Sequence, residues 1–165
     1  MASKTKPTDR ANARSAARLA AVQALYQMDM TGIDLTDVVS EFQTHRLGQE
    51  VEGDHYHAAE SEFFHDLVNG VVREQRQLDP MLDQQLAEGW RLNRVDSILR
   101  ALLRSAAFEL HIRDDVPARV VINEYLDIAH AFFSGEEPKV VNGVLDRLAR
   151  KVRSAEFDRA AIGEG

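Results

Sequence analysis

The amino-acid sequence predicts an all-α protein of about seven helices. Apolar residues recur at helical spacing in one segment after another, and no stretch shows the alternation of a strand over a useful length. The pattern is clearest over residues 94 to 112, which carry two apolar faces. A helix with two apolar faces has neighbours on both sides, so we expect this helix to lie at the centre of the core.

The N-terminal part is predicted to form two helices and a long loop. Residues 1 to 9 are polar and are expected to be a flexible basic tail. The alanine-rich residues 10 to 30 favour a helix that ends near Gly32. Residues 34 to 47 form a second amphipathic segment, and the acidic, glycine-containing residues 48 to 58 are expected to be the longest loop and the break between subdomains.

The middle of the chain is predicted to hold a helix over residues 60 to 78 and a separate short helix after it. Asp79 and Pro80 have the residue types of an N-cap followed by a first helical position, and Gly89 would end this short helix.

Three longer helices are predicted after it. The central helix is expected to have Asn93 as its N-cap. Asp96 would lie in its first turn, where the positive end of the helix dipole favours a carboxylate. Two further helices are expected over residues 117 to 134 and 138 to 153, and residues 156 to 165 are expected to be a second flexible tail.

Three polar or small residues are predicted to have structural roles. Glu109 lies on an apolar face of the central helix, so its carboxylate must find hydrogen-bond donors. We expect these donors to be the N–H groups of the next helix's first turn, or Asn123. The pair Asn142 and Gly143 would normally indicate a turn, but the helical period continues on both sides, which predicts a close-packing glycine inside a helix.

Basic residues gather at the start of an otherwise acidic chain. The net charge is −7, yet residues 1 to 28 carry +4, which leaves −11 on the remainder. Five of these residues are candidate RNA contacts: Lys4, Lys6, Arg10, Arg14 and Arg18. Three arginines spaced by four on one helix flank, after two lysines, are typical of an arginine-rich RNA-binding arm, although a solvated helix flank has the same pattern.

No catalytic, metal or cofactor site is predicted. The sequence has no cysteine and lacks the glycine-rich phosphate-binding motifs and the nucleophile elbow. His55 and His57 lie near carboxylates, but they lack the fixed helical spacing of a zinc motif. The absence of cysteine suits a protein of the reducing cytoplasm, and no segment has the length and apolarity of a membrane span or of a secretory signal.

Four motifs together resemble the NusB family of bacterial transcription antitermination factors. They span nearly the whole chain in the same order: ARSAARLAAVQALY at residues 13 to 26, LRSAAFEL at 103 to 110, DVP and INE at 115 to 117 and 122 to 124, and VNGVLD at 141 to 146. Each motif alone is weakly specific, but four in register are specific.

The resemblance implies a fold and a function. The fold would be one NusB-like helical domain over residues 10 to 155, made of two packed three-helix groups, without catalytic activity. The protein would bind boxA-type single-stranded RNA of ribosomal RNA transcripts with its partner NusE, within the RNA polymerase antitermination complex. Tyr26, Glu136 and Lys139 are candidates for the edge where RNA or this partner binds.

Two other functions fit parts of the pattern. The N-terminal module of a ribosomal RNA cytosine methyltransferase resembles the same family, but that enzyme needs a downstream α/β domain, so this alternative requires the 165 residues to be a fragment of a longer protein. A helix-turn-helix DNA-binding protein needs a basic recognition helix, whereas the helix pair at residues 117 to 134 and 138 to 153 combines both signs of charge.

Overall fold

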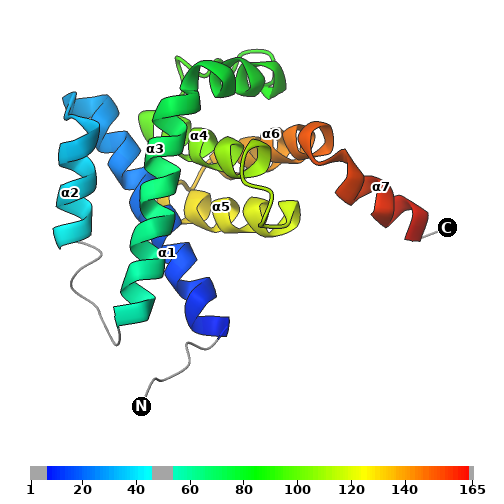
Figure 1. Ribbon diagram of the computed structural model, residues 1–165. Helices are drawn as coiled ribbons and strands as arrows, with labels where there is room; N and C mark the ends of the chain where they lie inside the picture. The colour runs from blue at the N-terminus through cyan, green and yellow to red at the C-terminus, as the bar shows by residue number, and fades with distance from the viewer. Residues whose placement is uncertain (1–6, 46–53, 164–165) are drawn as a thin grey trace. The chain divides into compact units, whose positions relative to one another are not determined.

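The computed structural model describes the backbone of residues 7 to 45 and 54 to 163, and side chains within residues 12 to 44 and 61 to 158. These ranges contain seven helices and no strand, which confirms the all-α prediction. The helices are α1 (Pro7–Thr31), α2 (Leu35–His45), α3 (Asp54–Gln85), α4 (Ser97–His111), α5 (Ala118–Phe132), α6 (Glu137–Val152) and α7 (Ser154–Gly163) (Figure 1).

The helices form two compact units, Met1–Val72 and Arg73–Gly165. The division falls inside α3, so it does not coincide with the break expected near residues 48 to 58. Residues 46 to 53 of that expected loop lie outside the described residues, and residues 54 to 57 already belong to α3.

The first unit contains α1, α2 and the beginning of α3. Helix α1 begins at Pro7, within the expected tail, because proline is favoured where a helix starts. Its buried side is made of small residues such as Ala17, Ala21 and Ala24. On the neighbouring helices, the ring of Phe42 in α2 stacks on that of Phe64 in α3, with the ring centroids 5.7 Å apart.

The second unit is organised around α4, as the sequence predicts. Helices α4, α5 and α6 each pack against the other two, and α7 continues from α6 (Figure 1). Both faces of α4 are buried: Leu99, Leu102 and Leu110 lie on one, and Ala101 and Phe108 on the other. Leu99, Leu102 and Leu110 are fully buried.

The prediction of a separate short helix at Pro80 is wrong, because α3 continues through this proline to Gln85. Leu78 and Leu82 are both fully buried, and their spacing of four places them on one helix face. The burial of these two leucines keeps the segment helical, although Pro80 has no backbone N–H and the helix loses one hydrogen bond there. The carboxylate of Asp79 is not an N-cap: it accepts two hydrogen bonds of 2.8 Å from the guanidinium of Arg104 on α4.

The start of the central helix also differs from the prediction. Asn93 is exposed, and the N-cap is Asp96, whose carboxylate accepts a 2.8 Å hydrogen bond from the N–H of Ile98. Both residues are good N-caps by type, so the choice depended on where the apolar face had to begin. At the other end of the chain, the expected flexible tail is largely the helix α7, on which the ring of Phe157 packs under the guanidinium of Arg150 at 4.8 Å.

The helical position predicted for Gly143 is confirmed, and the close approach at this glycine is to a side chain of the same helix. The glycine lies inside α6, and a Cβ atom there would lie 3.0 Å from a guanidinium nitrogen of Arg147. This guanidinium donates a 2.6 Å hydrogen bond to the carbonyl of Gln85, at the end of α3. Gly143 therefore leaves room for the Arg147 side chain, which hydrogen-bonds a carbonyl at the C-terminal end of α3. Asn142, beside Gly143, is exposed.

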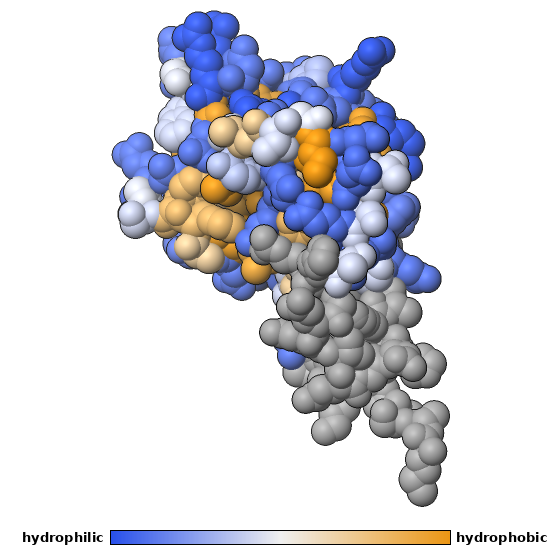
Figure 2. Space-filling model, turned by 90° about the vertical axis from the view of Figure 1, so that its left-hand side faces the viewer, coloured by the Kyte–Doolittle hydropathy of each residue, from blue (hydrophilic) through white to orange (hydrophobic). Residues whose placement is uncertain are grey.

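The surface shown in Figure 2 is mainly hydrophilic, with apolar residues gathered in patches. Large apolar side chains exposed within the described residues are Leu19, Met30, Val72, Ile112, Val120 and Phe132.

Candidate nucleic-acid interface

The arginines of α1 differ sharply in exposure. Arg14 is half-buried, whereas Arg18 is only 2 % exposed. Arg10 lies in the described part of the helix, but its side chain is outside the described residues, as are Lys4 and Lys6 altogether.

The arginines predicted to share one helix flank are therefore not equally exposed, because Arg18 is buried and Arg14 is only half-buried. With 3.6 residues per turn, each step of four residues rotates the side chain by about 40° around the helix axis. The stripe consequently turns away from the alanine side and places Arg18 beside Val22 and Leu25, which are also buried. Spacing by four keeps residues adjacent on a helix but does not keep them equally exposed.

Both arginines lie over the same aromatic ring. The guanidinium carbon of Arg14 is 4.8 Å from the ring centroid of Phe63 on α3, and that of Arg18 is 5.0 Å from it. Phe63 is itself 3 % exposed. At this distance the negative face of a ring attracts a cation, and the attraction is stronger where water is excluded. Sequence reasoning did not connect Phe63 with the arginines, because their helices are separated along the chain.

The residues proposed for a second edge lie in both units. Tyr26 is half-buried on α1, and Glu136 and Lys139 are exposed at the start of α6. Their expected role at one shared edge stays a prediction.

Glu136 and Lys139 line a cavity of about 320 Å³ within the second unit. The segment after α3 contributes the half-exposed Trp90, and α6 contributes the Arg147 guanidinium near Gly143. The full lining is Ala87, Trp90, Glu136, Lys139, Val140, Gly143, Val144 and Arg147. The cavity combines an aromatic ring with two cationic side chains and one carboxylate, and the sequence contained no signal that Trp90 would join them.

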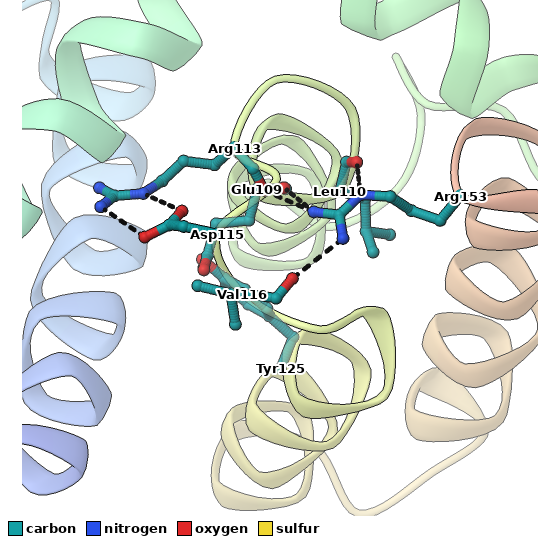
Figure 3. A network of polar contacts seen from close by, with 7 residues as sticks. All are labelled: Glu109, Leu110, Arg113, Asp115, Val116, Tyr125 and Arg153. Atoms are coloured by element: carbon teal, nitrogen blue, oxygen red, sulfur yellow. Dashed lines mark hydrogen bonds and ion pairs between the residues drawn. The ribbon is translucent and has the colours of Figure 1, made fainter. Parts of the chain in front are cut away.

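The strongest polar cluster in the second unit surrounds Arg153, the residue between α6 and α7 (Figure 3). Its guanidinium donates hydrogen bonds to the carbonyls of Leu110 (2.7 Å), Val116 (3.0 Å), Glu109 (3.0 Å) and Arg113 (2.5 Å). These carbonyls belong to the C-terminal end of α4 and the connection to α5. A cation at the negative end of a helix dipole is favourable, so Arg153 closes this helix end.

Glu156 completes this cluster from the first turn of α7. One carboxylate oxygen accepts a hydrogen bond from the N–H of Ala118 at the start of α5, and the other pairs with Arg153 at 2.8 Å. Partial burial alone would raise the pKa of Glu156, but the hydrogen bonds from Ala118 and Arg153 and the charge of Arg153 hold this pKa below its ordinary value.

No group of potential metal ligands occurs among the described residues, and none of their helices is long and apolar enough to cross a membrane. The side chains of His55 and His57 lie outside the described residues.

The fold and the site define a small all-α protein. Its candidate contact residue is Arg14 on the first helix, whose guanidinium lies against the ring of Phe63. The chain belongs to the NusB family, whose model matches residues 15–150. This match confirms the resemblance carried by the four motifs, and it confirms that the chain is not an enzyme, because the family consists of non-enzymatic antitermination factors. The matched region begins one residue after Arg14, so Arg10 and Arg14 precede it.

Individual relatives agree with this assignment. The transcription antitermination protein NusB of Rhodopseudomonas palustris (strain BisB18) is 58% identical over 154 residues, covering 93% of this chain and 91% of that protein. The solved structure of T. maritima NusB is 28% identical with a TM-score of 0.73, covering 88% of this chain and 96% of that chain. A structure of the antitermination factors NusB and NusE with double-stranded RNA shares the fold at 23% identity, with a TM-score of 0.70 and coverage of 85% and 98%.

Proposed function

We propose that this chain binds boxA-type single-stranded RNA of ribosomal RNA transcripts and promotes processive transcription in the cytoplasm. The observation that carries the proposal is the half-buried Arg14 on α1, whose guanidinium lies over the ring of Phe63. Arg10 precedes Arg14 on the same helix, and Lys4 and Lys6 come before that helix in the chain. Guanidinium groups bind phosphates and stack on unpaired bases, which are accessible in single strands. The antitermination name of the 58% identical relative supports the same function.

The charge distribution confines RNA binding to this basic region. The first 28 residues carry +4, whereas the rest of the chain carries −11 and repels phosphate. We therefore expect only modest affinity for RNA at physiological salt when the chain acts alone.

A partner would supply the missing affinity. We propose that this partner is NusE, within the RNA polymerase antitermination complex, because a structure of related fold contains NusB and NusE together with RNA. Joining two weak RNA-binding surfaces raises the effective concentration of the second, with gains of about 10²–10⁴ where the geometry allows. Tyr26, Glu136 and Lys139 are the candidates for the edge shared with RNA or this partner.

The salt dependence of RNA binding tests the arginine site. Each phosphate neutralised on a single strand contributes about −0.7 to the slope of log affinity against log salt. The double variant Arg10→Ala, Arg14→Ala should therefore bind boxA RNA more weakly and lose about 1.4 units of slope. Arg119→Ala is the matched control, because it removes an exposed arginine from α5 in the other unit. An unchanged slope in the double variant would refute the assignment.

Adding Arg18→Ala to the double variant asks whether the third arginine also binds a phosphate. Three equal contacts would remove about two units of slope in total. Because Arg18 is buried, we expect the double variant to show nearly all of the loss.

Competition separates the nucleic-acid classes. A boxA single strand should displace labelled boxA RNA at lower concentration than a scrambled single strand, duplex RNA or duplex DNA. Preferential competition by duplex DNA would instead favour a DNA-binding function.

Titration with the partner tests cooperative loading. Labelled boxA RNA is titrated with this protein, with NusE and with both, and the mixture should bind at much lower concentration than either component. If the mixture bound no tighter than the better single component, the cooperative mechanism would be wrong.

A further inference from the structure

The two described arginines of the basic region share Phe63 but differ in what their guanidinium groups can reach. Arg18 is 2 % exposed, so its guanidinium has almost no surface to offer a ligand. Arg14 is half-buried and keeps part of its side chain at the surface. Both lie within 5.0 Å of the ring centroid, so the same ring attracts a buried cation and a surface cation.

A free arginine side chain loses much conformational freedom when it binds a phosphate. A guanidinium already held against a ring has lost part of that freedom before the ligand arrives, which lowers the entropic cost of binding. The Phe63 ring is almost completely buried and belongs to α3, so the Arg14 guanidinium lies against a core side chain of another helix.

We propose that Phe63 is a positioning residue for RNA binding. Arg14 is the arginine that contacts the phosphate, and the buried Arg18 packs against the same ring. The inference rests on the proposed RNA-binding function and deepens it by assigning unequal roles to two arginines that are spaced as equivalents. Phe63 aligns Arg14 through the electrostatic attraction between ring face and guanidinium, and touches no RNA itself.

The ordinary role of a buried phenylalanine is packing, and the experiment must separate packing from the cation–ring attraction. Trifluorinated phenylalanine at position 63 nearly preserves the ring's shape but withdraws the negative charge from its face. The matched control is the same replacement at Phe64, the next residue of α3, which is fully buried and stacks on Phe42. Both rings are core residues of the same unit, but Phe63 has two guanidiniums over it, whereas the neighbour described for the Phe64 ring is the aromatic ring of Phe42.

We expect fluorinated Phe63 to weaken boxA RNA binding about 2- to 5-fold, the effect of one lost cation–ring contact at a partly exposed site. The salt slope should be unchanged, because Arg14 still neutralises its phosphate. Fluorinated Phe64 should bind RNA as the unmodified protein does. The Phe63→Tyr variant should retain most of the affinity, because tyrosine keeps a negative ring face.

A readout that needs no RNA follows the Arg14 side chain directly. The ring current of Phe63 should shift the Arg14 Nε–H resonance in NMR spectra, and fluorination should broaden or move this resonance while Arg119 keeps its own. Thermal unfolding of each variant verifies that the fold is intact.

The results distinguish failure of this inference from failure of the proposed function. Equal effects of fluorination at positions 63 and 64 would overturn the positioning role. So would a loss of affinity in Arg14→Ala without any effect of fluorinated Phe63. If Arg14→Ala bound RNA with the parent affinity and salt slope, the arginine site itself would be wrong and the positioning role would fall with it.

Discussion

The hydroxyl of Tyr125 donates a 2.5 Å hydrogen bond to the carboxylate of Glu109, which joins α5 to α4 inside the core. Both residues are fully buried, and the Tyr125 hydroxyl also lies 2.7 Å from the hydroxyl of Ser105 (Figure 3 shows Glu109 and Tyr125). The sequence predicted that Glu109 would accept hydrogen bonds from the next helix. That helix does supply a donor, the hydroxyl of Tyr125, whereas Asn123 is exposed.

Removing the carboxylate should destabilise the fold. We expect Glu109→Ala to lower the free energy of unfolding by about 1–3 kcal/mol, because the buried Tyr125 hydroxyl loses its hydrogen bond to the carboxylate. Urea denaturation measures the change. Glu88→Ala, which removes an exposed glutamate from the same unit, should change the stability by less than about 0.5 kcal/mol. Equal stabilities of the two variants would contradict a role for the buried pair.

The energetic coupling of the pair can be measured by a double-mutant cycle. Tyr125→Phe removes the donor and leaves the Glu109 carboxylate short of one partner. We expect the double variant with Glu109→Ala to be more stable than the sum of the two single losses implies, by about 0.5–3 kcal/mol, because the second change no longer breaks the hydrogen bond. Strictly additive losses would show that the contact contributes nothing specific.

Replacing Arg153 by lysine tests whether geometry or charge holds the end of α4. Lysine keeps the charge, but its single ammonium cannot reach four carbonyls and the Glu156 carboxylate as the planar guanidinium does. We expect Arg153→Lys to lower the free energy of unfolding by about 1.5–3 kcal/mol in denaturation experiments. Arg150→Lys is the control, since its ion pair with Asp146 is exposed and contributes little.

The depressed pKa of Glu156 makes part of the stability depend on pH. A carboxyl whose pKa is lower in the folded state stabilises the fold at pH values above its unfolded pKa. This stabilisation is lost as the pH falls through the lower folded pKa. We expect Glu156→Gln to lose stability near neutral pH and to approach the parent protein as the medium becomes acidic. Parallel curves of unfolding free energy against pH would contradict this linkage.

Much of the fold could be predicted because helix formation follows from local pattern. The apolar period of α4 and of α6 marked their buried faces correctly, and the continued period across Asn142 and Gly143 correctly overruled a turn. The errors came where two local signals were equally good. Asn93 and Asp96 are both N-cap residues, and Asp79 before Pro80 has the residue type of a helix start.

The candidate site was less predictable, because it depends on contacts between distant segments. The composition and order of residues were sufficient to place the basic region on the first helix and to indicate the NusB family. Whether an arginine there is exposed depends on the side chains that surround it, so the burial of Arg18 and the position of Phe63 beside both guanidiniums emerged only from the packing of α1 against α3. The same reason explains Arg153, whose acceptors on α4 and before α5 are brought to it by the packing of the second unit. Periodicity along the chain specifies which face of a helix is apolar, and the neighbouring helices decide which polar side chains that face encloses.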